Sequence, residues 1–324
     1  MSTASHSRAI PAIGIDFGGT TIKSGLVING QIARRGTIID TQQYSGPSAI
    51  LDALVAVIED LRKGEPDVAA IGIGLPGLVD SVNGIVHELT NVPGWSDVAL
   101  RTLLNERTGL HVIIENDANA MAYGEWKYGA AKNGRHVICI TLGTGVGGAL
   151  ILDGRLYRGA QLGAGEIGHM SIDLRGRPGP YGNDGGLEEY VGNHQIAERA
   201  QERYKGAGDE RTITQCAPAE LAAKALAGDA IAKQLWEDVG TEVGAALASV
   251  VWILNPDTIV IGGGVAKAGD LIFDPIRRAI CGRTQKVIHE QLRVVPAALG
   301  NDAGIIGNAV LALESEQQAR ATRL

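Results

Sequence analysis

One pattern occurs twice in this 324-residue chain and restricts the folds open to it. The stretch "IGIDFGGTTIKSGLV" begins at Ile13, and "ICITLGTGVGGALIL" begins at Ile138, an offset of 125 residues. Each reads as a strand, a turn rich in glycine and threonine, and a second strand. Two glycine-rich hairpins can match by chance, but a repeated unit more economically indicates two similar α/β halves.

The segments around the hairpins alternate between buried strands and helices. "VAAIGIGLPG" (68–77) is apolar throughout and reads as a buried strand. The segment 95–109, "WSDVALRTLLNERTG", is predicted to be a helix capped by Ser96. This alternation predicts an α/β layer architecture.

The chain length suggests two domains. We expect a smaller N-terminal α/β domain over residues 1–122, completed by a C-terminal helix at 308–322. The larger C-terminal α/β domain is expected over 123–307. A glycine-rich turn from each half would then line one cleft.

Composition excludes several classes of function. The net charge of −7 and a pI near 5.5 argue against a nucleic-acid partner, which requires basic patches. The three cysteines form no CxxC pair, which favours a reduced, cytoplasmic protein. The longest apolar run, 243–254, is too short for a membrane span of about 20 residues, and the N-terminus resembles no signal peptide.

The first glycine-threonine turn offers the groups that bind phosphate and Mg²⁺. Glycine lets consecutive backbone N–H groups approach phosphate oxygens, and threonine hydroxyls and a lysine add donors. A carboxylate just before the turn can hold Mg²⁺ through water. A plain hairpin that binds nothing is the alternative for either copy alone. The candidate residues are Asp16, Gly18, Gly19, Thr20, Thr21 and Lys23.

A third glycine cluster follows the strand in "DTIVIGGGVAKAGD" (257–270). Flat glycine backbone at Gly262, Gly263 and Gly264 suits a nucleotide base or ribose laid against it. A strand-to-helix turn without a ligand explains the cluster equally well.

The stretch "HVIIENDANAMAYGE" (111–125) ends an apolar run in polar residues where a helix begins. Asp117 there is an N-cap, a catalytic group or both, because α/β folds place ligand chemistry at the carboxyl ends of strands. Asn116 suits sugar hydroxyls. Further polar residues lie among glycines and could complete a pocket that binds hydroxyl groups by hydrogen bonds. They are Glu166, His169 and Glu188. Phosphate turns and such a pocket together indicate phosphoryl transfer to an alcohol, with Asp117 accepting the proton.

Together these motifs resemble the ROK family of sugar kinases and repressors, in the actin-like ATPase/hexokinase superfamily with ribonuclease H-like domains. The matching elements stand in family order from residue 13 to about 310: "GIDFGGTTIKSGLV", "GIGLPGLVD", "ENDANA", "TLGTGVGGALI", "GEIGHM" and "IVIGGGV".

The resemblance implies a role for each matched residue. Asp117 corresponds to the catalytic base. The sugar contacts correspond to Gly77, Asn91, Asn116, Glu166, His169 and Glu188. The metal and phosphate end corresponds to Asp16, Gly18, Gly19, Thr20 and Lys23, the second phosphate loop to Thr144 and Gly145, and the adenine side to Gly263 and Gly264.

The chain departs from the family pattern at one place. The family usually follows its histidine with CxCGxxGC, and the histidine and three cysteines bind a structural zinc. Here those places fall at Gly179, Tyr181 and Gly186, so we expect no zinc, because a tetrahedral site needs four N or S ligands. We expect a backbone carbonyl or Asp184 to orient His169 instead.

The resemblance implies an ATP-dependent kinase that uses Mg²⁺ to phosphorylate the 6-hydroxyl of glucose, and a homodimer formed through the larger half. Fructose, mannose, N-acetylglucosamine and N-acetylmannosamine remain alternative acceptors, and polyphosphate an alternative donor. A non-catalytic sugar sensor is a further alternative. We do not expect a repressor, which would need a winged helix before the first strand near residue 10, nor a nicotinamide-dependent enzyme, because neither hairpin turn opens into a helix.

Overall fold

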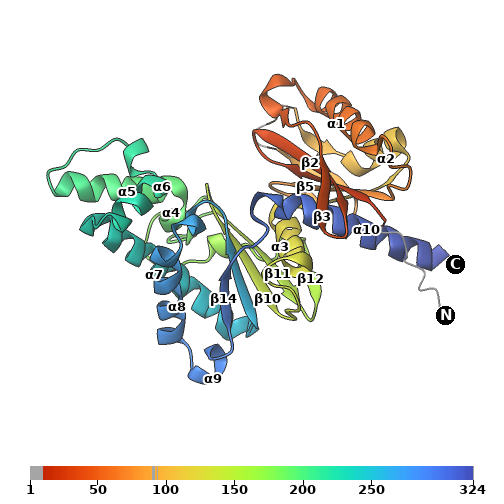
Figure 1. Cartoon of the computed structure of the whole chain (residues 1–324). Helices are drawn as coiled ribbons and strands as arrows, with labels where there is room; N and C mark the ends of the chain where they lie inside the picture. Colours follow the sequence, from red (N-terminus) through yellow and green to blue (C-terminus); the bar gives the residue numbers. More distant parts are fainter. Residues whose placement is uncertain (1–9, 90–91, 93, 324) are drawn as a thin grey trace. The chain divides into compact units, whose positions relative to one another are not determined.

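The computed structural model describes residues 10–89, 92 and 94–323, which group into two compact units (Figure 1). Unit 1 comprises the chain up to Gly129 together with Asn301 onward, and unit 2 comprises Ala130–Gly300. Among the described residues, no helix combines the length and apolarity needed to cross a bilayer.

Unit 1 is built on one main sheet with the strand order β3-β2-β1-β5-β9, and β4 pairs with β2. The β1-β2-β3 pairs are antiparallel, whereas β5 and β9 continue the sheet parallel to β1. The strands are β1 (Ala12–Phe17), β2 (Thr21–Ile28), β3 (Gln31–Arg35), β4 (Ile39–Asp40), β5 (Ala70–Leu75) and β9 (His111–Asn116).

Two helix pairs cover the two faces of this sheet (Figure 1). The helices α1 and α2 bury leucine and isoleucine side chains against one face, and α3 and α10 pack on the other. Their bounds are α1 (Pro47–Arg62), α2 (Leu100–Thr108), α3 (Asp117–Tyr128) and α10 (Ala303–Arg323).

A small antiparallel sheet precedes α2 and corrects one sequence prediction. It consists of β6 (Val79–Asp80), β7 (Ile85–Glu88) and β8 (Ser96–Val98). The predicted helix cap at Ser96 is therefore wrong: Ser96 pairs with Glu88, and α2 begins at Leu100 after the cap residue Ala99. Pairing with the preceding strand β7 occupies backbone groups that the local pattern assigned to a helix.

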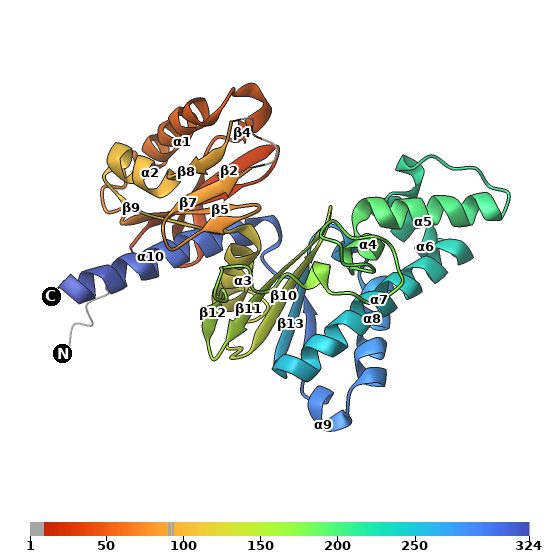
Figure 2. The same ribbon diagram turned by 180° about the vertical axis from the view of Figure 1, so that it is seen from behind.

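Unit 2 repeats this plan with the strand order β12-β11-β10-β13-β14 (Figure 2). Again two antiparallel neighbours lie on one side of the first strand and two parallel neighbours on the other. The strands are β10 (Val137–Leu142), β11 (Val146–Leu152), β12 (Arg155–Tyr157), β13 (Thr258–Gly262) and β14 (Arg293–Pro296).

The helices of unit 2 pack around one long helix, α7, whose apolar side chains form the centre of the core. They are α4 (Glu188–Val191), α5 (Asn193–Gly206), α6 (Pro218–Leu226), α7 (Ala230–Leu254), α8 (Asp270–Arg283) and α9 (Lys286–His289).

The hairpin repeat predicted from the sequence is confirmed. The first strands, β1 and β10, differ by the 125-residue offset. Their turns differ by one residue: Gly18 N–H donates to the carbonyl of Thr21, three residues on, whereas Gly143 N–H donates to that of Gly145, two residues on, both over 2.9 Å. The prediction of two similar α/β halves therefore holds.

Glycines let α10 lie directly on the sheet and on α3. A Cβ at Gly72 would lie 1.9 Å from the Asn308 carbonyl oxygen, and one at Gly307 would lie 1.8 Å from that of Ala120. These approaches explain why the units divide at residues 129 and 300 rather than at 122 and 307. The whole of α3 packs on α10, which begins at Ala303 rather than at residue 308.

We predict that Gly72→Ala destabilises the protein by about 2 kcal/mol or more, because the added methyl group meets helix backbone that cannot rotate away. Gly282→Ala is the control: nothing lies within 4 Å of its Cβ position in α8, so alanine should be neutral or stabilising by up to about 1 kcal/mol. Urea denaturation of both variants measures the difference. Equal effects would contradict the proposed close approach.

Candidate active site

Three predicted motifs of unit 1 lie at one edge of its main sheet. The strands β1, β5 and β9 are parallel, so their carboxyl ends meet at that edge. The first glycine-threonine turn follows β1, Gly77 follows β5, and Asn116 and Asp117 stand where β9 ends and α3 begins.

The N-cap of α3 is Asn116, so the prediction that Asp117 caps this helix is wrong by one residue. The Asn116 Oδ1 accepts from the N–H groups of Ala118 (3.0 Å) and Asn119 (3.2 Å). Asp117 is the first helical residue, and its Oδ1 accepts from Ala118 N–H over 2.8 Å. Its carboxylate thus lies at a helix N-terminus, where the helix dipole favours negative charge.

Two contacts hold this junction in place. The Asn116 Nδ2 donates to the Gly77 carbonyl at 3.5 Å, which brings two predicted sugar ligands together. The buried Glu115 carboxylate accepts from Asn116 N–H and from Asn119 Nδ2, each over 3.0 Å. Glu115 escaped the sequence analysis because it lies inside an apolar strand, and Asn91, a predicted sugar ligand, falls outside the described residues.

Asp16 and Lys23 face each other across the first hairpin, as direct partners in the β1–β2 register. Burial raises the pKa of Asp16, and the Lys23 ammonium offsets part of this rise. A Cβ at Gly304 would lie 3.1 Å from the Asp16 Cγ, so α10 closes over the carboxylate. A partly buried carboxylate with one partial counter-charge suits a hard divalent cation such as Mg²⁺.

The first turn is also tied to the following chain. Thr41 donates its N–H to the Thr20 carbonyl and its hydroxyl to the Gly19 carbonyl, both over 3.0 Å. These bonds occupy two carbonyl groups of the turn, and among its N–H groups that of Gly18 donates to the Thr21 carbonyl. The Thr20 side chain is exposed. No local sequence pattern identified Thr41.

In unit 2, a predicted sugar ligand contacts the second phosphate hairpin. The Glu188 carboxylate accepts from Val146 N–H over 2.7 Å. A Cβ at Gly145 would lie 2.3 Å from that carboxylate, so glycine is required there while Glu188 keeps this position. Thr144, at the tip of the turn, is exposed.

The third glycine cluster lies beside this turn. Because β10 and β13 are parallel neighbours, Gly263 follows the same sheet edge as the second hairpin turn. Gly263 has φ +90°, and a Cβ there would lie 2.2 Å from the Leu142 carbonyl oxygen, whereas nothing lies within 4 Å of that position at Gly264. The cluster is thus a flat backbone surface next to the predicted phosphate loop.

His169 contacts aromatic and acidic neighbours. Its ring meets Tyr181 edge to face, with centroids 5.1 Å apart, and its Nε2 lies 4.0 Å from the exposed Glu166 carboxylate. Asp184 accepts through its backbone carbonyl from the Ser171 hydroxyl (2.6 Å). Among the described residues, the ring therefore contacts Tyr181 and Glu166, and no contact with the predicted partner Asp184 is seen.

The donor set near His169 does not fit zinc. The three places matched to the family's cysteines hold Gly179, Tyr181 and Gly186, which provide no thiolate. Of the chain's cysteines, Cys139 and Cys216 are buried in the core of unit 2, and Cys281 is exposed on α8.

We predict that Asn116→Ala lowers stability by about 1 kcal/mol, because two N–H groups of the first helical turn lose their acceptor. Asn116→Ser should keep most of the stability, since serine caps about as well as asparagine and adds no charge beside Glu115 and Asp117. Thermal unfolding of both variants provides the comparison. A loss of the same size in Asn116→Ser would show that the cap is not the cause.

Because the pKa of Asp16 is raised in the folded protein, we predict that ionisation of this carboxyl group lowers the free energy of unfolding as pH rises. The contribution of this carboxyl group to stability is fully present below its ordinary pKa of 3.8 and is lost as pH rises through the higher folded-state pKa. Asp16→Asn should therefore gain stability relative to the wild type as pH rises over this window, and this difference should then stay constant. Denaturant titrations over a pH series measure it. A difference that does not change with pH would contradict burial of the carboxylate.

Comparison with known proteins places the chain in a family. The sequence model of the ROK family matches residues 12–315. A glucokinase of Streptomyces coelicolor is 34% identical over 94% of this chain and 98% of its own length. A ROK family glucokinase from Streptomyces griseus, solved with glucose and AMPPNP, is 32% identical with a TM-score of 0.76 and covers 94% of this chain and 99% of that chain.

The xylose repressor of Bacillus spizizenii is 30% identical over 95% of this chain and 78% of its own length. The relatives thus include both kinases and regulators. The family model and the kinase relatives match nearly the whole chain, and the solved glucokinase has the same fold of two actin-like domains. The chain therefore belongs to the ROK family.

Proposed function

We propose that the protein is an ATP-dependent hexose kinase that phosphorylates the 6-hydroxyl of glucose, with Asp117 as the general base. The observation that carries the proposal is the β9–α3 junction. There the amide of Asn116 caps the helix, which leaves the Asp117 carboxylate at the carboxyl end of β9, the last strand of the main sheet. The glucokinases among the relatives support the substrate class.

In this mechanism, Asn116 and Gly77 orient the sugar, and Asp117 accepts the proton of the 6-hydroxyl as that oxygen attacks the γ-phosphorus. The bond between the γ-phosphorus and the bridging oxygen breaks, and ADP leaves. Glu115 contributes indirectly, because its bonds to Asn116 and Asn119 hold the junction rigid.

The first turn and Asp16 form the phosphate end in unit 1. The Gly19 N–H group and the Thr20 hydroxyl, together with Lys23, are proposed to neutralise charge on the phosphoryl group. Gly18 shapes the turn, because its own N–H group donates to the Thr21 carbonyl. Asp16 would hold Mg²⁺ through water, and the ion would supply a positive charge to the β- and γ-phosphate oxygens. The positive charge of the cation would also offset the unfavourable free energy of burying the charged Asp16 carboxylate.

Unit 2 is proposed to contribute the nucleotide surface and further sugar ligands. Thr144 and Gly145 bind phosphate, and the flat backbone at Gly263 and Gly264 accepts adenine. Glu166, His169 and Glu188 bind sugar hydroxyls. The homodimer and the cytoplasmic location implied by the resemblance stay predictions.

The repressor among the relatives supports a second candidate, a sugar sensor without turnover. Other hexoses and N-acetylhexosamines, as well as a polyphosphate donor, remain alternatives within the kinase reaction.

Asp117→Asn should lower kcat at least about 10²-fold, because general-base help is worth roughly 10² to 10⁴ in rate. A coupled ADP-release assay with Mg-ATP and a panel of hexoses and N-acetylhexosamines measures this and identifies the acceptor. Asp52→Asn, an exposed position on α1, is the control and should leave kcat unchanged. If Asp117→Asn kept more than about a tenth of the wild-type kcat, Asp117 would not be the base. If no sugar were turned over but one raised the Tm, the sensor would replace the kinase.

A further inference from the structure

The loop over residues 170–187 connects two predicted sugar ligands. His169 precedes the loop, and Glu188 follows it as the first residue of α4. The sequence resemblance implies a zinc site at this loop in the family's usual pattern. Here the corresponding places offer no thiolates, so other contacts must fix the loop and the ligands at its two ends.

Arg177 ties the middle of the loop to α4. Its backbone N–H donates to the Tyr190 hydroxyl and its guanidinium Nη1 to the Glu189 carbonyl, both over 3.0 Å. Its own carbonyl accepts from Gly185 N–H over 2.7 Å. The guanidinium also lies 5.6 Å from the centroid of the Tyr190 ring. One residue thus joins both limbs of the loop to the short helix that begins with Glu188.

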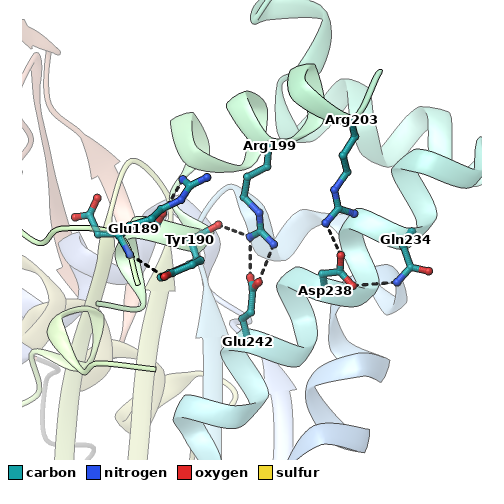
Figure 3. Close-up of polar contacts among 8 residues, drawn as sticks. Glu189, Tyr190, Arg199, Arg203, Gln234, Asp238 and Glu242 are labelled. Atoms are coloured by element: carbon teal, nitrogen blue, oxygen red, sulfur yellow. Dashed lines mark hydrogen bonds and ion pairs between the residues drawn. The ribbon is translucent and has the colours of Figure 1, made fainter. Parts of the chain in front are cut away.

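Arg199 ties α4 in turn to the core helix α7 (Figure 3). From α5, its Nη1 donates to the Tyr190 carbonyl over 2.7 Å, and its two terminal nitrogens bind the two Glu242 oxygens, each over 2.7 Å. The side chains of Arg199 and Glu242 are only 11% and 23% exposed. Bidentate charge-assisted bonds of this kind fix geometry as well as adding stability.

The Arg199–Glu242 ion pair depends on Arg199 for its stability. Burial raises the pKa of Glu242, and the Arg199 guanidinium opposes this rise. Removing Arg199 would leave a partly buried carboxylate without its counter-charge, and the Tyr190 carbonyl would lose its donor. Tyr190 is therefore held at both ends, at its hydroxyl by the loop and at its carbonyl by the helix layer.

We propose that Arg177, Tyr190, Arg199 and Glu242, the α4 anchor, replace a metal in fixing this loop and thereby position His169 and Glu188. These are positioning residues, because they act on the sugar only through those two ligands. The expected effect on turnover rests on the proposed function. The expected effect on loop order does not.

The chain contains a matched control on the same two helices. Arg203 lies one turn after Arg199 on α5 and binds Asp238 on α7 over 2.5 Å, and Gln234 donates to the same carboxylate over 2.9 Å (Figure 3). This pair joins the same helices, and among the described residues it makes no bond to α4. Arg199→Lys and Arg203→Lys therefore make the same substitution in two α5–α7 ion pairs, only one of which reaches the loop.

The experiment compares these two full-length variants by hydrogen exchange over residues 170–191 and by steady-state kinetics with the accepted sugar. Lysine keeps the charge but cannot form all three bonds of Arg199. We expect Arg199→Lys to raise exchange in this segment and to raise the sugar KM about tenfold with kcat within about threefold, the pattern of lost sugar binding. Arg203→Lys should change neither quantity.

Tyr190→Phe tests the anchor with little risk to folding, since it removes only the hydroxyl that accepts from Arg177. It should raise exchange over the loop but not over α7. Treating the wild type with a zinc chelator should change nothing, and elemental analysis should find no stoichiometric zinc.

Three results would overturn the proposal: equal effects of Arg199→Lys and Arg203→Lys, unchanged loop exchange in both Arg199→Lys and Tyr190→Phe, or stoichiometric zinc whose removal loosens the loop. If the wild type turned over no sugar, the proposed function would fail, but the exchange comparison would still decide whether the anchor holds the loop.

Discussion

The close approach of α10 to strands β1 and β5 is the constraint on which unit 1 depends. Glycines at positions 14 and 72 allow it, because a Cβ at either would lie within 2 Å of a carbonyl oxygen of α10. Asn308 adds a buried bond by donating its Nδ2 to the Ile15 carbonyl over 2.8 Å. The last helix of the chain therefore completes the first domain.

The helix α10 also packs beside the two groups of unit 1 that are proposed to act in the reaction, the Asp16 carboxylate and the helix that carries Asp117. At its start, Gly304 lies against Asp16, and further along Gly307 lies against the Ala120 carbonyl of α3. The first turn of α3 carries Asp117. One helix thus packs beside the carboxylate proposed to hold Mg²⁺ and beside the helix that presents the proposed base, so small shifts in α10 would move both.

The two hairpins share a backbone plan but differ in how their turns are held. Thr41 occupies two carbonyl groups of the first turn, whereas Glu188 occupies the N–H of Val146 at the second. If Glu188 binds sugar as proposed, its bond to an N–H group of the proposed phosphate loop would link sugar binding to phosphate binding within unit 2. The same Glu188 begins the helix that Arg199 holds, so the anchor reaches this loop as well.

Local sequence patterns predicted the parts of this protein that depend on local structure. The hairpin repeat was visible because each copy carries its own strand and turn residues in order. Patterns failed where pairing or packing with another segment decided the outcome: Ser96 joins a strand through pairing with Glu88, and α3 belongs to unit 1 through α10. Neighbouring residues can exchange roles without changing the pattern, which is why the cap fell on Asn116 rather than on Asp117.

The α4 anchor could not be predicted from local patterns either, for a similar reason. Its residues come from a loop and three helices, and none forms a motif with its sequence neighbours. Their roles became visible only from bonds that join Arg177 to Tyr190 and Arg199 to Glu242.

The proposed mechanism depends on the Asp117 carboxylate acting as general base toward the sugar hydroxyl. A crystal structure with glucose and AMPPNP would test this, because a general base must lie within about 2.6–3.2 Å of the oxygen whose proton it accepts. We predict that an Asp117 oxygen lies at this distance from the glucose O6, with that oxygen facing the γ-phosphorus. A bound glucose whose O6 faces another residue, with Asp117 bonded only within its own helix, would contradict it.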